Sequence, residues 1–153
     1  MMIKLCAFAD EADSSLDGQI AALKRNNIPY LELRSIAGKN VKDFSLEEAK
    51  EYAKTLAENG ISVWSIGSPI GKVGIDVDID VYMKDVRHVC ELAKIFGTTR
   101  IRMFSFFHAY ESVKRLWHIC RKWQTLRRNM TWSCIMKMKR IFTAISWKEC
   151  RIL

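Results

Sequence analysis

The C-terminal part of the sequence lacks both glycine and proline. All seven glycines and both prolines lie in residues 1–111, whereas residues 112–153 carry four of the five tryptophans and eleven Lys or Arg side chains against one acid. The formal net charge of +8 is therefore −2 for residues 1–111 and +10 for residues 112–153. Without turn-forming residues this tail does not look like an ordinary domain, and it is too apolar for a typical disordered arm.

Long apolar runs and metal-type cysteine spacings are also missing. No segment approaches the roughly 18 consecutive apolar residues of a membrane span, and the N-terminus reaches Asp10 and Glu11 before a signal-type apolar core is complete. We therefore expect a cytoplasmic protein with no membrane partner. Five cysteines without a CxxC spacing favour reduced thiols over disulfides or zinc, and Cys6 and Cys90 are expected in the core.

Residues 1–111 show short apolar runs that alternate with amphipathic stretches, a rhythm typical of βα units around a parallel sheet. Strands are expected at residues 3–8, 30–33, 61–66 and 100–104. The first helix is expected to begin at Ser14 or Ser15 and to end by residues 26–29. The second begins with a capping box of Ser45 and Glu48 and buries a stripe of Leu46, Ala49, Ala53, Leu56 and Ala57. The third follows the Asp-rich loop 76–80 and ends at Gly97.

Polar residues after each strand favour half of an eight-stranded barrel over a doubly wound dinucleotide-binding sheet. Such a sheet needs a glycine-rich turn after its first strand, but residues 9–13 read Ala-Asp-Glu-Ala-Asp, whose acids would repel phosphate. A barrel instead carries its functional groups at the carboxyl ends of all its strands. We interpret Asp10 and Glu11 as a charge cluster at a helix entrance rather than as a catalytic pair.

Two charged residues lie inside expected strands. Period-two alternation places Glu32 on the same face as Tyr30 and Arg34, and Arg102 on the same face as Arg100. In a barrel the second and fourth strands contribute to the same interior layers, so Glu32 and Arg102 are expected to meet near its mouth. A structural ion pair and a substrate contact are equally consistent with this placement.

Four segments in order resemble the sugar phosphate isomerase/epimerase family of xylose isomerase-like TIM barrels. They are Phe-Ala-Asp-Glu at 8–11, Tyr-Leu-Glu-Leu-Arg at 30–34 with Gly-Lys-Asn-Val at 38–41, Ser-Ile-Gly-Ser-Pro-Ile-Gly-Lys at 65–72, and Arg-Ile-Arg-Met-Phe-Ser-Phe at 100–106. The resemblance covers residues 3–110. It implies an α/β fold in which residues 1–111 form the first four βα units of a TIM barrel. Residues 112–153 are expected to follow as an aberrant, basic and helical tail.

The resemblance implies aldose–ketose isomerisation or epimerisation of a small sugar or sugar phosphate through a metal-stabilised enediolate. By analogy Glu32, Ser68, Lys72 and Arg102 would contact the substrate, although the sequence alone slightly favours an ordinary solvated loop lysine at Lys72. The intact family uses a divalent metal (Mn, Mg or Zn) held by residues of the second half of the barrel. This chain carries none of them in recognisable form, so we expect it to bind no metal and to be truncated and inactive as written.

A change of reading frame accounts for the tail. Joining the third base of each codon to the first two bases of the next gives Glu unambiguously at Met136–Lys137, Met138–Lys139 and Trp147–Lys148. From Ile135 the junctions permit a string that begins His-Glu-Asn and resembles the family's fifth strand, in which the Glu is a metal ligand. We therefore interpret residues 112–153 as a frameshift product, from a gene lesion or a sequencing error.

Three other consequences are open at this point. Half a barrel leaves its first and fourth strands as unpaired edges, which predicts self-association, and residues 113–126 could form basic helices. The eleven cations and four indoles of the tail could instead bind nucleic acid or an anionic surface, although out-of-frame translation gives the same composition without a function. An endonuclease IV-like phosphodiesterase is disfavoured because the third strand ends without histidine, and His108 alone is more often a loop residue.

Overall fold

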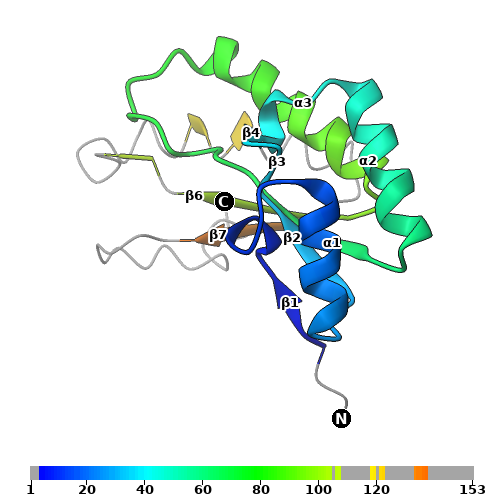
Figure 1. Ribbon diagram of the computed structural model, residues 1–153. Coiled ribbons are helices and arrows are strands. Elements are labelled where there is room, and N and C mark those ends of the chain that lie inside the picture. The colour runs from blue at the N-terminus through cyan, green and yellow to red at the C-terminus, as the bar shows by residue number, and fades with distance from the viewer. Residues whose placement is uncertain (1–3, 105, 108–117, 120, 123–132, 138–153) are drawn as a thin grey trace.

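The computed structural model describes residues 4–104, 106–107, 118–119, 121–122 and, for the backbone, 133–137. Strands and helices alternate through most of these residues (Figure 1). The helices are α1 (Leu16–Arg25), α2 (Leu46–Glu58) and α3 (Ile79–Ile95), with the short 3-10 turns η1 (Ala9–Glu11) and η2 (Val41–Asp43). The strands are β1 (Cys6–Ala7), β2 (Tyr30–Leu33), β3 (Ser35–Ile36), β4 (Lys39–Asn40), β5 (Ser62–Gly67), β6 (Arg100–Phe104) and β7 (Ser133–Lys137).

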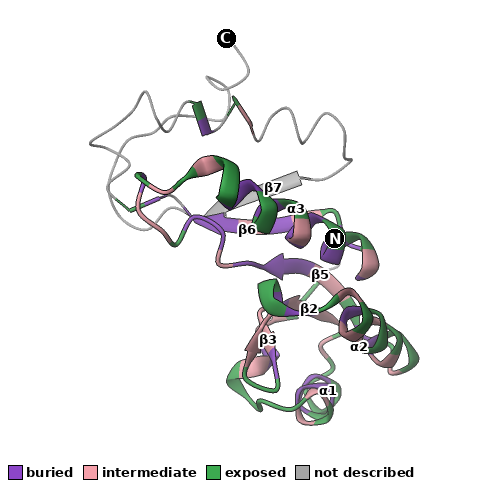
Figure 2. Ribbon diagram, turned by 90° about the horizontal axis from the view of Figure 1, so that it is seen from above, coloured by how far each residue is buried: buried purple, intermediate pink, exposed green. Residues whose placement is uncertain are grey.

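The main sheet has the order β1-β2-β5-β6-β7, and each neighbouring pair is parallel. Helices connect the strands up to β6 and lie along one face of the sheet (Figure 1). The core lies between this face and the helices, and β5 and β6 are among its most buried segments (Figure 2). Its sheet residues are Leu31, Leu33, Ile66, Ile101 and Met103, none more than 1% exposed. The residues that alternate with them face the side that the helices leave free.

The helix boundaries follow the expected capping signals. Ser15, rather than Ser14, caps α1, because its Oγ accepts a hydrogen bond of 3.1 Å from Gly18 N. The capping box of Ser45 and Glu48 is present at the start of α2. The third helix, α3, ends at Ile95, two residues before Gly97, whose φ of +66° is the left-handed conformation that favours glycine after a helix.

Two local expectations are wrong, and one further feature was not anticipated. Cys6 is exposed rather than in the core, because β1 is a two-residue edge strand in place of the six-residue strand expected at 3–8. Ala57 is exposed, because it lies beyond the stripe of α2 that faces the sheet. The antiparallel hairpin of β3 and β4, which turns at Ala37 and Gly38, was not anticipated. Cys90 is buried as expected.

The expectation that the fourth barrel strand, β6, has an unpaired outer edge is also wrong. The backbone of β7 pairs with β6 over five residues, from Arg100–Ser133 to Phe104–Lys137. Ile119 is 1% exposed within the main core, and Lys122 pairs with Asp80 of α3. His118, Ile119, Arg121 and Lys122 are helical, whereas the rest of residues 113–126, His108 and the expected boundary at 111/112 lie outside the described residues.

Candidate functional site

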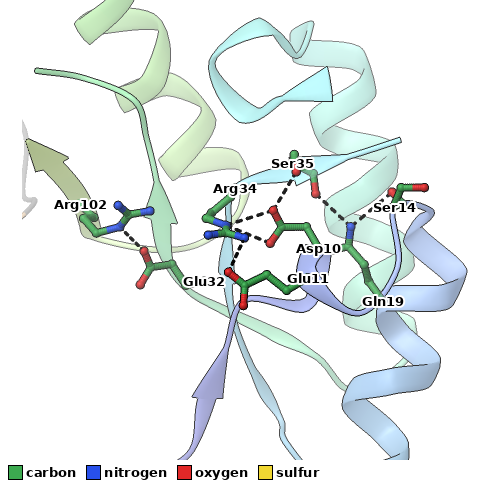
Figure 3. Close-up of polar contacts among 8 residues, drawn as sticks. All are labelled: Asp10, Glu11, Ser14, Gln19, Glu32, Arg34, Ser35 and Arg102. Atoms are coloured by element: carbon green, nitrogen blue, oxygen red, sulfur yellow. Dashed lines mark hydrogen bonds and ion pairs between the residues drawn. The ribbon is translucent and has the colours of Figure 1, made fainter. Parts of the chain in front are cut away.

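A mostly buried ion pair lies on the helix-free face of the sheet, towards the carboxyl ends of the strands. The guanidinium Nε of Arg102 on β6 donates to Oε1 of Glu32 on β2 (Figure 3). The two side chains are 11% and 18% exposed. They therefore meet as the strand alternation predicts, although β5 separates their strands in the sheet.

Gly67, the last residue of β5, has no side chain, and the ion pair lies where a side chain at this position would be. A Cβ atom built at Gly67 would lie 2.9 Å from Nη2 of Arg102 and 3.1 Å from Oε1 of Glu32. It would also lie 2.7 Å from Cγ of Arg34. Contacts this short require the neighbours to move, so a glycine is needed here for close approach rather than for an unusual backbone angle.

A second ion-pair cluster lies beside the first. Arg34, directly after β2, donates from Nε to both carboxylate oxygens of Asp10 at 3.0 Å, and its Nη2 lies 2.9 Å from Oε1 of Glu11 (Figure 3). The Asp10 carboxylate also accepts a hydrogen bond of 2.9 Å from Ser35 Oγ. Asp10 and Glu11 lie in the first turn of η1, which agrees with the interpretation of a charge cluster at a helix entrance. The structure adds that Arg34, at the end of β2, binds both acids.

Buried Gln19 connects α1 to this second cluster. Its Nε2 donates to the carbonyl oxygens of Ser35, at 3.0 Å, and Ser14, at 3.4 Å. Gln19 is 1% exposed, so these bonds are made away from solvent. The same segment, at Ser35, thus supplies a hydroxyl to Asp10 and a carbonyl to α1, which fixes the first helix against the second strand (Figure 3).

Two phenylalanine rings lie among the cations. The Arg34 guanidinium carbon is 4.5 Å from the ring centroid of Phe8, and that of Arg102 is 4.9 Å from the ring centroid of Phe104. The ammonium of Lys72 lies 4.7 Å from the same Phe104 ring. These distances are in the range of cation–π contacts, so the rings help to orient the charged groups.

The loop after β5 is held against the end of β6. Ser68, which is fully buried, donates from its hydroxyl to the Arg102 carbonyl at 2.7 Å. Gly71 has a φ of +86°, and a Cβ there would lie 1.9 Å from the carbonyl oxygen of Phe104. Its N–H donates to the Tyr82 hydroxyl at 2.5 Å. This anchoring positions the exposed side chain of Lys72 beside the ion pairs.

The metal expected for the intact family finds no ligand set in the described part of the chain. Among those residues no group of three His, Cys, Asp or Glu side chains could hold a metal ion. The carboxylates at the carboxyl end of the sheet already have cationic partners. Asp10 and Glu11 bind Arg34, and Glu32 binds Arg102. These acids therefore do not fit a metal centre.

The structure brings all four residues expected to contact substrate to one end of the sheet, in different ways. Glu32 and Arg102 are paired, Lys72 is exposed above Phe104, and Ser68 is buried beneath the loop. The expectation did not include Phe8, Gly67 or Phe104. Gly67 could have been found from the sequence, because a glycine at a strand end between two strands with inward charges signals close approach.

Several solved structures share this architecture. A probable 3-DHS dehydratase, AsbF, from Bacillus anthracis superposes with a TM-score of 0.66 at 14% identity, over 89% of this chain and 52% of its own. IOLI protein with a bound zinc atom gives a TM-score of 0.62 at 15% identity, over 89% and 51% of the two chains. The fold is that of a partial xylose isomerase-like TIM barrel.

A xylose isomerase domain protein from Planctomyces limnophilus gives a similar match, with a TM-score of 0.58 at 16% identity over 80% of this chain and 51% of its own. The chain thus spans about half the length of each of these structures. No family model and no curated protein sequence matches it. Within the described residues no helix is long and apolar enough to cross a membrane.

Proposed function

We propose that this chain carries the substrate-facing half of a sugar isomerase or epimerase that converts aldoses and ketoses or inverts a sugar carbon. The observation that carries the proposal is the Glu32–Arg102 pair beside Gly67 at the carboxyl end of the sheet. In TIM-barrel enzymes the active site lies at this end of the strands. The fold supports the proposal at the level of architecture, because the matching structures include a xylose isomerase domain protein.

The four substrate-contact candidates divide by exposure. Lys72 and the outer edges of Glu32 and Arg102 are placed to touch a small polyhydroxy compound. Ser68 is a positioning residue, because its hydroxyl fixes the Arg102 backbone from a fully buried site. A carboxylate could move a proton next to the substrate carbonyl, and a guanidinium could stabilise the oxygen that becomes negative. The divalent cation of the intact family would add further charge stabilisation, which the described residues do not supply.

We further propose that the chain as written is inactive because its second half is out of frame from about residue 112. The position of β7 supports this. Its backbone occupies the place of the fifth barrel strand beside β6. The alternative frame across Met136–Lys137 reads the Glu of the family's fifth strand. The residues that occupy the fifth strand position are therefore also the residues whose alternative frame encodes the Glu of the family's fifth strand.

An activity comparison tests the proposal. The 153-residue chain and a frame-restored polypeptide would be assayed side by side on ketoses, aldoses and their phosphates with Mn²⁺ or Mg²⁺. We expect the restored polypeptide to interconvert at least one pair and the present chain to be silent. A restored polypeptide that binds metal and folds, but converts no sugar and no sugar phosphate, would overturn the proposed function.

A further inference from the structure

We infer that the residues around Phe8, at the carboxyl end of the sheet, bind the uncharged, hydroxyl-bearing end of the substrate. We also infer that the described residues of this half of the barrel form no phosphate subsite. The inference rests on the proposed function and narrows it to a substrate class at one set of residues. It depends on three features: the charge balance of the mouth, the capped helix N-termini, and the pairing of aromatic rings with ion pairs.

Among the residues that the structure describes, the charged groups at the carboxyl end of the sheet leave no surplus of positive charge for a phosphate dianion. Arg34 is neutralised by Asp10 and Glu11, and Arg102 by Glu32. A phosphate that recruited Arg102 would leave Glu32, whose side chain is only 18% exposed, without its partner. An unpaired, mostly buried carboxylate is strongly unfavourable. Lys72 is the mouth cation without a carboxylate partner among the described residues, and one exposed ammonium is a weak phosphate site.

The N-termini of α1, α2 and α3 are each capped by a side chain of the protein itself. A helix N-terminus binds phosphate through free backbone N–H groups. Here Ser15 caps Gly18 N in α1, and Ser45 caps Glu48 N in α2. In α3 the Asp78 carboxylate accepts hydrogen bonds from the backbone N–H groups of Asp80 and Val81. Each first turn also carries an acid, which repels an anion.

An uncharged hydroxyl, in contrast, can bind without breaking an ion pair. A hydroxyl donates one hydrogen bond and accepts others, so neighbouring hydroxyls can donate to Glu32 while accepting from Arg102. The apolar C–H face of a sugar packs on an aromatic ring. Phe8 is partly exposed, and the guanidinium carbons of Arg34 and Arg102 lie 4.5 Å and 5.6 Å from its ring centroid. The arrangement of ring, donor and acceptor therefore matches a polyol better than a phosphate.

Saturation-transfer NMR on the full 153-residue chain tests the inference, with D-xylulose, D-xylulose 5-phosphate and inorganic phosphate as probes. We expect both sugars to give saturation-transfer signals and to bind with equal affinity. Excess inorganic phosphate should not reduce the D-xylulose signal, and the ³¹P resonance of free phosphate should not broaden. The ³¹P measurement needs no variant, so it does not depend on any substitution folding correctly.

Two matched pairs of variants locate the binding. Phe8→Leu should abolish the D-xylulose signal, whereas Phe107→Leu, at a 51% exposed ring beyond the end of β6, should preserve it. Glu32→Gln should weaken it several-fold, and Glu58→Gln on α2 should not. Both outcomes would support the inference.

The negative outcomes separate the inference from the proposed function. Binding of the sugar phosphate but not of D-xylulose, or competition by inorganic phosphate, would overturn the inference and leave the isomerase proposal in place. Equal signals in Phe8→Leu and Phe107→Leu would overturn the assignment of the binding site to the residues around Phe8. Binding of neither sugar would contradict both, because the proposed function itself requires a sugar contact here.

Discussion

Glu32 and Arg102 form an ion pair across an intervening strand, and Gly67 is the residue that makes this possible. In the register of the sheet Gly67 of β5 lies directly beside Arg102 of β6. A side chain there would occupy the line between the guanidinium and the carboxylate. The ion pair between β2 and β6 therefore depends on the absence of a side chain at Gly67.

Gly67→Ala should destabilise the protein through close contacts rather than through backbone strain, because Gly67 does not have a positive φ. The new methyl group would lie within 3.1 Å of Arg34, Arg102 and Glu32 side-chain atoms, so both ion-pair clusters must shift. We expect the free energy of unfolding to fall by about 1–3 kcal/mol, as for overpacking in a core. Urea denaturation measures this loss. Ser62→Ala, at an exposed position on the same strand, is the control and should change stability little.

Arg102→Met should cost more than the simultaneous removal of both charges. The single variant leaves Glu32 mostly buried and unpaired, for which we expect a loss of about 2–3 kcal/mol in unfolding free energy. The double variant Glu32→Met with Arg102→Met should recover part of that loss. Additive losses in a double-mutant cycle would show that the two side chains do not interact in solution.

Lys122→Met should raise the pKa of Asp80. The Lys122 ammonium lies 2.5 Å from the Asp80 carboxylate, and this hydrogen bond and charge lower the pKa of Asp80 from its ordinary value. Because the folded-state pKa is lowered, the pairing stabilises the protein above the ordinary carboxyl pKa and is lost as the pH falls through the lowered value. An NMR pH titration of Asp80 reads this out. An unchanged pKa in the variant would mean that Lys122 does not contact α3.

Cys90 should resist alkylation until the protein unfolds. Burial raises the pKa of its thiol to about 11, so little reactive thiolate exists near neutral pH. We expect iodoacetamide to label exposed Cys6 in the native protein and Cys90 only in urea, as judged by peptide mass spectrometry. Rapid native labelling of Cys90 would show that α3 does not pack on the sheet as described.

The edge strand β1 should promote self-association. Among the described residues β1 pairs only with β2, and neighbouring Leu5 is 56% exposed. An unpaired edge beside an apolar side chain favours pairing with another chain. We expect light scattering to show oligomers that Leu5→Lys reduces and Val81→Lys, on exposed α3 surface, does not. A clean monomer with cooperative unfolding would contradict this.

The sequence predicts the parts of this fold that rest on local signals. Strand β6 was expected at its observed bounds because Arg100 and Arg102 alternate with apolar residues, and the Ser45–Glu48 capping box marks the start of α2. The meeting of Glu32 and Arg102 followed from the same alternation combined with barrel geometry. Each of these features depends on spacing along the chain.

Features that depend on tertiary contacts could not be found this way. The exposure of Cys6 depends on where the sheet ends, and the binding of Asp10 to Arg34 depends on how η1 packs against β2. Strand β7 has no local signal, because Ser133–Lys137 lacks strand-like alternation and lies in a segment of unusual composition. Its pairing with β6 is a property of the sheet edge rather than of local sequence.

The central claim is that half of a barrel is followed by a remainder read in the wrong frame. Sequencing the gene from the codon of Tyr110 onward tests this most directly. We expect a second open frame that continues through the tail and reads Glu across Met136–Lys137. A gene with no alternative open frame in this region would contradict the claim, and the basic tail would then be the protein's own sequence.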